Sequence, residues 1–270
     1  MTRRIVHLSD IHFGRAKAEL VEPLASAINA LAPDLAVISG DLTQRARHTQ
    51  FRAARAFVDR LDPPVLCVPG NHDTPLDNPF MRAASPWSRW RRWMGEDLEP
   101  RWADEEMAVI GVNTVNRWAI QSGRIGAGTR RRMAAAMTEA LGDAPDGAPG
   151  RIGVIVAHHP LEHEPGERKR RTRGAGTAID AMAAAGVDIV LTGHLHAWRA
   201  EPLSRGGAIQ VQAGTALSTR QRGEENDFNL LTLDPDTIVV ERYVAEGRVF
   251  LPGRRAVFVR GGEGWRSVES

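Results

Sequence analysis

Five short clusters of side chains that can bind metal ions lie between residues 10 and 196. Each cluster contains aspartate, asparagine or histidine, and each follows a short apolar run. The clusters are Asp10-Ile11-His12, Gly40-Asp41, Gly70-Asn71-His72-Asp73, His158-His159-Pro160 and Gly193-His194-Leu195-His196. Carboxylate, imidazole and amide ligands together suit Mn, Fe, Zn or Co better than Ca or Mg. These residues therefore indicate metal-dependent chemistry.

The spacing within the clusters indicates how they could share ions. In Asp10-Ile11-His12 and His194-Leu195-His196, an i, i+2 spacing on an extended backbone places both side chains on the same side. Each pair could then hold neighbouring metals. Gly40, Gly70 and Gly193 lack a Cβ where the chain must turn sharply and bring a ligand close to an ion. A single Asp-x-His is usually a surface or capping feature, but five such clusters in equivalent places are not expected by chance.

The segments between the clusters indicate an α/β protein. Aliphatic runs typical of strands alternate with segments that carry apolar residues at helical spacing. The expected strands are Ile5–Leu8, Leu35–Ser39, Val65–Val68, Met107–Val112, Ile152–Ala157 and Val187–Thr192, and the expected helices are Ala16–Leu31, Thr49–Leu61, Thr129–Leu141 and Ala178–Ala185. Because ligands bind at the strand ends of open α/β sheets, we expect the five clusters to converge in space.

The sequence becomes strand-rich after Gly214. Phe228–Leu233, Thr237–Val244 and Ala256–Val259 are separated by turn residues such as Pro252-Gly253, which predicts an antiparallel completion of the fold. Residues 142–150 are rich in glycine and proline and predict a flexible connection. We expect a single domain over residues 1–270, with the motifs in about 5–215 and the completion in about 216–270.

The composition excludes several other classes of protein. Hydrophobic residues make up 42% of the chain and charged residues 25%, which is typical of globular proteins and argues against disorder. The net charge of +2 indicates no particular partner. The first apolar stretch is too short for a signal peptide, and no run approaches the roughly 20 apolar residues of a membrane span. A soluble, cytoplasmic protein is expected.

Taken together and in this order, the five clusters resemble the motifs of calcineurin-like metallophosphoesterases. The opening Leu8–Gly14 and the Gly70-Asn71-His72-Asp73 cluster are most similar to those of bacterial class III cyclic-nucleotide phosphodiesterases. The resemblance extends from about residue 5 to about residue 215. It implies an α/β fold of four layers, an α/β/β/α sandwich in which two mixed sheets are flanked by helices.

The resemblance also implies a role for each residue of the clusters. Two sets of ligands flank a bridging carboxylate: Asp10, His12 and His196 on one metal, Asn71, His158 and His194 on the other, and Asp41 between them. His159 occupies the variable place before Pro160 and is assigned a supporting or structural role. His72 would protonate or stabilise the leaving oxygen. Asp73 would orient His72.

The implied reaction is hydrolysis of a phosphoester by two divalent or mixed-valence metal ions. Two metals roughly 3.5–4 Å apart can activate a water molecule and stabilise the attacking and leaving oxygens. By resemblance, a metal-bound hydroxide attacks phosphorus in line. Two divalent ions, the carboxylates of Asp10 and Asp41, and a hydroxide leave one positive charge, which a phosphodiester monoanion would neutralise. A small anionic phosphodiester is therefore the expected substrate, and 3′,5′-cyclic AMP is the named candidate.

Other functions stay open at this point. Glycerophosphodiesters and nucleotide-linked lipid precursors are alternative substrates. A non-catalytic metal-binding scaffold of the same fold is an alternative of a different class, although the intact ligand set argues against it. A nuclease is disfavoured because little chain is left for a DNA-engaging domain. Protein phosphatase activity is disfavoured because Gly40-Asp41-Leu42-Thr43-Gln44 lacks the Asp-Arg-Gly continuation of such enzymes.

Two further segments have two interpretations each. The basic run Arg168–Arg173 could overhang the site and attract anionic substrate, or it could be a solvated loop. It lacks the interleaved aromatic residues that would favour nucleic-acid binding. Trp87, Trp90 and Trp93 recur at helical spacing, which is typical of a core or interface stripe, while an oligomer contact or a cap over the substrate is the alternative. A homo-oligomer is compatible with these features.

Overall fold

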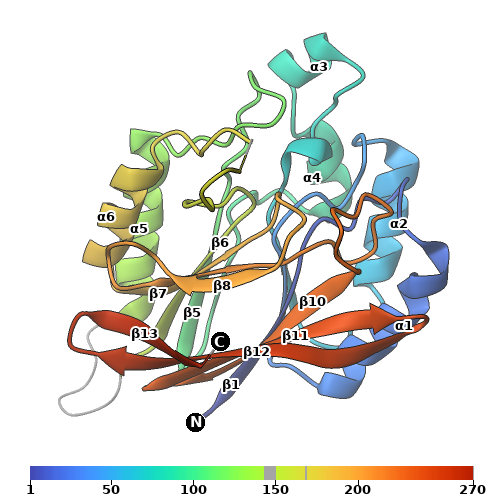
Figure 1. Ribbon diagram of the computed structural model, residues 1–270. Helices are drawn as coiled ribbons and strands as arrows, with labels where there is room; N and C mark the ends of the chain where they lie inside the picture. The colour runs from blue at the N-terminus through green and yellow to red at the C-terminus, as the bar shows by residue number, and fades with distance from the viewer. Residues whose placement is uncertain (143–149, 168, 270) are drawn as a thin grey trace.

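Two mixed sheets lie face to face in the computed structural model, which describes residues 1–142, 150–167 and 169–269 (Figure 1). The strands of the larger sheet are β1 (Arg3–Leu8), β2 (Leu35–Ile38), β3 (Val65–Cys67), β10 (Asp227–Asp234), β11 (Thr237–Glu246), β12 (Val249–Gly261) and β13 (Gly264–Glu269). Their order across the sheet is β13-β12-β11-β10-β1-β2-β3. β1, β2 and β3 are parallel, whereas β10 pairs with β1 in the antiparallel sense.

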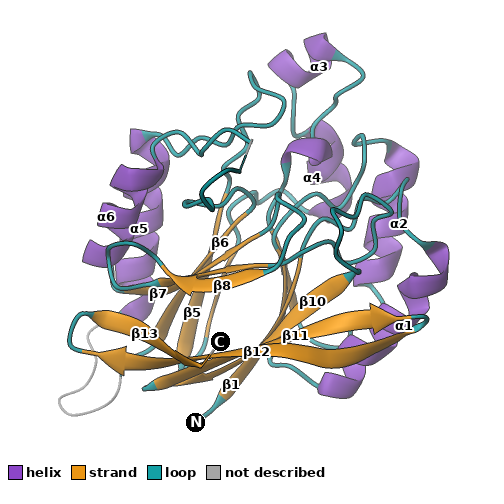
Figure 2. Cartoon of the chain, viewed as in Figure 1, coloured by secondary structure: helices purple, strands orange, loops and turns teal. Residues whose placement is uncertain are grey.

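The smaller sheet is formed by the middle of the chain. Its strands are β4 (Arg101–Ala103), β5 (Met107–Val112), β6 (Ile152–Ala157), β7 (Val187–Thr192), β8 (Arg199–Pro202) and β9 (Ile209–Gln212). They lie in the order β4-β5-β6-β7-β9-β8, with β5, β6, β7 and β9 parallel. The parallel strands of both sheets therefore bring their carboxyl ends to one edge of the molecule, where the loops gather (Figure 2).

Helices cover the outer face of each sheet. The helices are α1 (Ala18–Leu31), α2 (His48–Val58), α3 (Pro79–Ala84), α4 (Ser88–Met94), α5 (Ala127–Leu141) and α6 (Ala175–Ala184), with a 3₁₀ turn η1 at Asn71–Asp73. Figure 1 shows α1 and α2 on one side of the sheets and α5 and α6 on the other, while α3 projects beyond the strand ends.

Three apolar cores separate the four layers: one lies between the two sheets, and one lies between each sheet and its helices. Alternate residues of a strand point to opposite faces, so Ile5 of β1 packs between the two sheets while Val6 packs under α1 and α2. Ile155 of β6 packs under α5 and α6 with Met133 and Met182. Each sheet is thus buried on both faces, which explains why its parallel strands are continuous aliphatic runs. The predicted α/β/β/α sandwich is confirmed.

The predicted elements agree with the structure to within a few residues, with some omissions. The six strands and four helices expected in the first part of the chain are present, and the antiparallel completion after Gly214 is confirmed. The turn expected at Pro252-Gly253 is wrong, because β12 continues through both residues and Pro252 pairs with Tyr243 beside a bulge. A proline fits a strand next to such an irregularity, since one ladder hydrogen bond is already lost.

Several short elements carry no clear pattern in the sequence. β4 and β8 consist of three and four residues and are largely exposed, so they lack the aliphatic run that predicts a strand. The flexible connection expected at residues 142–150 lies mostly outside the described residues, which omit 143–149. Within the described chain, no helix combines the length and the apolar character that crossing a membrane requires. The single domain over residues 1–270 stays a prediction.

Candidate metal centre

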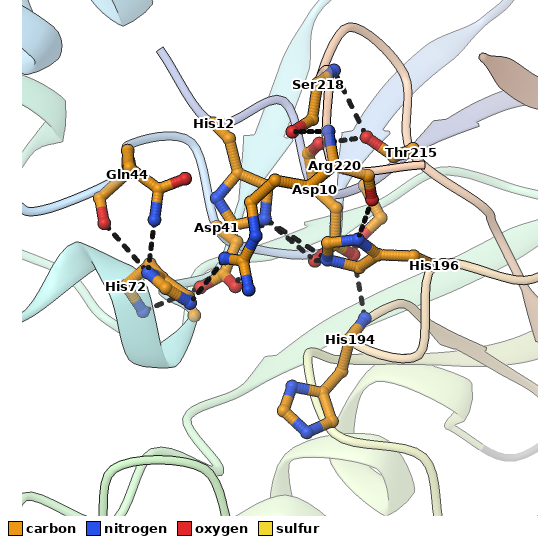
Figure 3. A network of polar contacts seen from close by, with 12 residues as sticks. Asp10, His12, Asp41, Gln44, His72, His194, His196, Thr215, Ser218 and Arg220 are labelled. Carbon is orange, nitrogen blue, oxygen red and sulfur yellow. Dashed lines mark hydrogen bonds and ion pairs between the residues drawn. The ribbon is translucent and has the colours of Figure 1, made fainter. Parts of the chain in front are cut away.

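The candidate ligands all lie just beyond the carboxyl ends of parallel strands. Asp10 and His12 follow β1, Asp41 follows β2, and Asn71 lies in η1 after β3. The ligands from the other sheet are His158 after β6 and His194 and His196 after β7. Their side chains are buried, and Figure 3 shows those of Asp10, His12, Asp41 and His196 directed toward one another. The structure therefore brings the predicted residues together from both sheets.

Asp10, His12 and His196 form the first cluster. Nε2 of His12 lies 3.2 Å from Nε2 of His196, and Oδ1 of Asp10 lies 3.0 Å from Nε2 of His196. Two imidazole nitrogens bound to one ion at ~2.0–2.1 Å are separated by roughly this distance. Oδ1 of Asp10 is buried and has no hydrogen-bond partner in the described structure. The three side chains therefore fit a shared metal ion.

His158, Asn71 and His194 form the second cluster, with Asp41 between the two. Nε2 of His158 lies 3.2 Å from Oδ1 of Asn71 and 3.3 Å from Oδ2 of Asp41. The ring centroid of His194 is 5.1 Å from that of His158, and the buried Nε2 of His194 has no hydrogen-bond partner in the described structure. Oδ2 of Asp41 also lies 3.8 Å from Nε2 of His12. Asp41 is thus placed to contact ions in both clusters.

His159, to which a supporting or structural role is assigned, lies directly beside the second cluster. Its Nδ1 is 2.8 Å from Oγ1 of Thr114, while its Nε2 is buried and without a hydrogen-bond partner in the described part of the chain. Its ring centroid is 4.5 Å from that of His194, and one ligand atom from each of His158, His159 and His194 lies within 4.8 Å of the others. The geometry alone therefore admits His159 beside His158, and the role assigned to it stays a prediction.

Five of the candidate ligands have a left-handed backbone. The residues with positive φ are Asp10 at 51°, His12 at 53°, Asp41 at 52°, His194 at 71° and His196 at 57°. Such a conformation costs an ordinary residue roughly 1–2 kcal/mol, and it persists where the surroundings impose it. The extended backbone assumed for the i, i+2 pairs is therefore wrong. The side chains converge because the chain coils tightly after each strand, and His194 and His196 consequently reach different clusters.

The close approach of the strand ends depends on glycine. A Cβ added to Gly70 would overlap the backbone and carboxylate of Asp41, and one added to Gly193 would overlap the side chain of Ser9. The contact at Gly193 lets Oδ2 of Asp10 accept a hydrogen bond from the backbone N–H of His194 at 2.7 Å. Gly70 and Gly193 thus let the strand ends approach each other closely. The prediction that they bring a ligand close to an ion stays a prediction.

The buried charges of the two clusters balance one another. Burial would raise the pKa of Asp10, but the nearby imidazoles of His196 and His12 outweigh it and hold that pKa well below its usual range. The pKa of Asp41 is lowered in the same way, mainly by His158, and burial lowers the pKa of His194. Burial would lower the pKa of His158, but Asp41 raises it to about 9. Ionised carboxylates and a neutral His194 are the forms that bind metal.

His72 projects from η1 beside the two clusters, and its ring is held by residues that the sequence did not single out. Its Nδ1 is 2.8 Å from the carbonyl oxygen of Gln44, and its Nε2 is 3.2 Å from Nη1 of Arg220 (Figure 3). Since carbonyl oxygens only accept and guanidinium groups only donate, we assign the proton of a neutral ring to Nδ1. Burial lowers the pKa of His72.

Asp73 does not contact the ring of His72, as its predicted orienting role would require. Its carboxylate accepts hydrogen bonds from the backbone N–H groups of Leu42, Thr43 and Gly70 at 2.8–3.2 Å. Asp73 therefore joins the loop that carries Asp41 to the turn that carries Asn71. This contact positions ligands of both clusters.

The basic segment and the tryptophan stripe have different places in the structure. Arg168 lies outside the described residues, but Lys169 reaches the site and donates a hydrogen bond to the carbonyl oxygen of His194. Burial lowers the pKa of Lys169 to about 8. Trp90 is buried in the core against Phe51 of α2, and Nε1 of Trp93 donates to His48 at 3.0 Å. Both side chains therefore hold α4 on α2 and do not cap the site.

Comparison with known proteins gives a consistent result. The model of the calcineurin-like phosphoesterase family matches residues 3–198. The glycerophosphodiester phosphodiesterase GpdQ of Enterobacter lignolyticus is 32% identical over 80 residues, 26% of this chain and 29% of that protein. A probable cyclic nucleotide phosphodiesterase of Synechococcus is 29% identical over 84 residues, 28% of this chain and 33% of that protein.

The matched segments therefore span about a third of the length of these two relatives. A similar fold is found in a dimetal phosphatase from Danio rerio, with a TM-score of 0.65 and 14% identity over 93% of this chain and 98% of that chain.

Proposed function

The chain belongs to the calcineurin-like phosphoesterase family, and from that premise we propose that it hydrolyses a phosphodiester at a centre of two transition-metal ions. The position of Asp41 carries the proposal, because its Oδ2 faces Nε2 of His12 at 3.8 Å and Nε2 of His158 at 3.3 Å. A carboxylate shared by two clusters of ligand atoms is suited to a pair of neighbouring ions.

The residues present fit two ions of the Mn, Fe, Zn or Co type. Asp10, His12 and His196 would hold one ion, Asn71, His158 and His194 the other, and Asp41 both. Such a pair of ions, when bound, activates water and stabilises the charge of the reacting phosphoryl group. The mixed oxygen and imidazole ligands agree with this choice of metals.

His72 and Arg220 are the groups that would act on the leaving oxygen. Nε2 of His72 accepts a hydrogen bond from Arg220, so this nitrogen carries no proton. A bound phosphate would attract the guanidinium of Arg220, because charge-assisted hydrogen bonds to phosphate are stronger than one to imidazole. Nε2 of His72 would then be free to take up a proton from solvent and donate it to the leaving oxygen, which becomes a hydroxyl group.

Two observations favour a diester over a monoester. The two curated relatives are named for diesters, although each match covers only about a third of the relative. In addition, cavities of about 730 and 1020 Å³ lie next to the site, one lined by His72 and the other by Lys169. A diester has two substituents to place, and these cavities offer one place for each.

The proposal is tested by turnover of bis(p-nitrophenyl) phosphate, p-nitrophenyl phosphate and 3′,5′-cyclic AMP with Mn-reconstituted protein. We expect metal-dependent cleavage of at least one diester at a higher kcat/KM than the monoester. Asn71→Ala removes a ligand and should abolish the activity, while Ser26→Ala, an exposed change on α1, should leave it intact. Activity that survives in Asn71→Ala, or that favours the monoester, would refute the proposal.

The same assay separates the alternatives. Glycerophosphodiesters and nucleotide-linked lipid precursors can replace cyclic AMP as substrates without any change in the mechanism. A non-catalytic scaffold would bind metal and hydrolyse none of these esters. The described site argues against a scaffold, because each of the seven proposed ligand positions carries a side chain that can bind metal.

A further inference from the structure

The cavity beside His72 has two chemically different ends. Its volume is about 730 Å³, which is in the range of pockets that hold small organic ligands. Arginines line it near the candidate metal centre, whereas the side chains of α3 and of the 116–120 loop are mainly apolar. The metal-dependent step proposed above uses only His72 and Arg220 of this cavity, so the rest of its lining needs another explanation.

The cationic end is formed by Arg15, Arg45 and Arg220, which all adjoin residues of the site. The backbone N–H of Arg15 donates to the carbonyl oxygen of His12 at 2.8 Å, and Arg45 follows Gln44, which contacts His72. Arg220 bonds to His72 directly. No carboxylate of the described residues forms an ion pair with any of the three guanidinium groups. This end therefore suits the anionic phosphoryl group of a substrate.

The opposite end is apolar. Leu76, Pro79 and Ile120 line it together with Trp118. Trp118 is 69% exposed and Ile120 66%, and Phe80, next to Pro79 in α3, is 82% exposed. Large apolar side chains are usually exposed singly, and a group of them at the mouth of a cavity marks a binding surface.

Hydrogen bonds within the protein hold the apolar wall in place. Arg82 of α3 is buried and donates to the carbonyl oxygens of Arg117 at 2.9 Å and Ala119 at 2.7 Å. In return, Nη1 of Arg117 donates to the carbonyl oxygen of Ala83 at 3.2 Å. Asn78 caps the start of α3 by accepting from the backbone N–H of Met81. These bonds fix α3 against the 116–120 loop, which lowers the entropic cost of binding.

The far side of the same loop faces a different environment. Trp118 and Ile120 also border the cavity of about 1020 Å³, whose other lining residues are mainly polar and include Lys169, Arg170 and Arg222. The loop therefore separates an amphiphilic cavity beside His72 from a polar and cationic cavity beside Lys169.

We propose that the substrate is an amphiphilic phosphodiester that joins a large apolar alcohol to a polar group. The apolar alcohol lies against Trp118 and Ile120, the phosphoryl group lies near Arg220, and the polar substituent lies beside Lys169. This inference rests on the proposed function and narrows its substrate class. The alcohol is either a long alkyl chain or an aromatic ring system, because both bury apolar surface against an indole and an aliphatic side chain.

The test measures how tightly alkyl and aryl phosphates bind to the Mn-reconstituted protein. Ethyl, octyl and 2-naphthyl phosphate are compared by isothermal titration and as competitive inhibitors of bis(p-nitrophenyl) phosphate turnover. Since a fully buried CH₂ is worth about four-fold in affinity, octyl phosphate should bind at least about ten-fold more tightly than ethyl phosphate even if its chain is only half buried. A gain for octyl alone indicates an alkyl alcohol, and a larger gain for 2-naphthyl indicates an aromatic one.

The variant W118S/I120S should reduce that preference at least about five-fold. Val249→Ser is the matched control, because Val249 is also exposed, at 56%, but lies on β12 and borders neither cavity. Equal binding of the three phosphates, or an unchanged preference in W118S/I120S, would overturn the inference even if the diester is still hydrolysed. Loss of both diester turnover and phosphate binding in the wild type would instead refute the proposed function.

Discussion

Gly193→Ala tests whether the strand ends must touch to build the metal centre. Gly193 precedes His194 at the end of β7 and faces Ser9 and Asp10 at the end of β1. An added Cβ would overlap Oγ of Ser9 and would lie 2.5 Å from Oδ2 of Asp10 and 2.6 Å from Cβ of Ser9. Gly193 has no positive φ, so the methyl group, and not the backbone conformation, causes the effect.

The expected loss in free energy of unfolding is about 2.5–6 kcal/mol. Ser9 and Asp10 are fully buried, so they have no free space into which they could move. Overpacking of this kind costs about 1–3 kcal/mol. Relief of the overlap would also break the hydrogen bond from the N–H of His194 to Asp10, which spans 2.7 Å and is worth about 1.5–3 kcal/mol because the acceptor is charged. The same movement would separate the ligands and reduce the metal content.

The assay is urea denaturation of the metal-free protein, followed by metal analysis after Mn reconstitution. Gly262→Ala is the matched control, because an added Cβ there meets no atom within 4 Å and Gly262 has no positive φ. The double variant S9G/G193A removes the nearest obstacle and should recover about 1 kcal/mol. If Gly193→Ala unfolds at the same urea concentration as Gly262→Ala and binds as much metal, the close contact between β1 and β7 does not matter and the reasoning is refuted.

Three further predictions concern other parts of the molecule. Burial lowers the pKa of His7 to about 3, so between pH 6.5 and pH 3 the unfolded state binds a proton that the folded state does not. Relative to His7→Gln, the wild type should therefore lose about 1.4 kcal/mol of unfolding free energy per pH unit in this range, measured by urea denaturation. Equal losses in the two proteins would contradict this prediction. Arg82→Gln should weaken octyl phosphate binding at least about five-fold and lower the free energy of unfolding by about 2 kcal/mol, because the carbonyl oxygens of Arg117 and Ala119 lose their hydrogen-bond donor. An unchanged affinity for octyl phosphate would show that the wall formed by α3 and the 116–120 loop does not bind the alkyl chain. His158→Ala should lower the metal content relative to the wild type, while His159→Ala should not. The reverse result would make His159 the metal ligand and give His158 the supporting role.

The sequence predicts the convergence of the ligands because parallel strands impose it. Asp41 and His158 are 117 residues apart in the chain, yet each follows a strand whose neighbours run in the same direction. The aliphatic runs of these strands are long enough to identify, and their common edge then brings the clusters together. Two cores beneath helices and one between the sheets follow from the same runs, because each strand is buried on both faces.

Features set by irregular backbone could not be predicted in this way. The left-handed φ of Asp10 and His12 results from tertiary contacts, since an isolated Asp-x-His gives no reason to leave the extended conformation. Arg220 lies in a segment without a recognisable motif, and only the path of the chain after β9 brings it to His72. The wall formed by α3 and the 116–120 loop depends on hydrogen bonds from Arg82 to backbone carbonyls, which no pattern of residue types reveals. A cytoplasmic location and a homo-oligomer stay predictions.

The most direct test of the two-metal centre is the number of metal ions bound per chain, measured by mass spectrometry after reconstitution with Mn and removal of free metal. The account predicts two ions in the wild type and in the control Asp62→Ala, whose carboxylate is exposed and distant from the clusters. Asp41→Ala, which removes the carboxylate that faces both clusters, should retain fewer than one. Two ions retained in Asp41→Ala, or none in the wild type, would contradict the account.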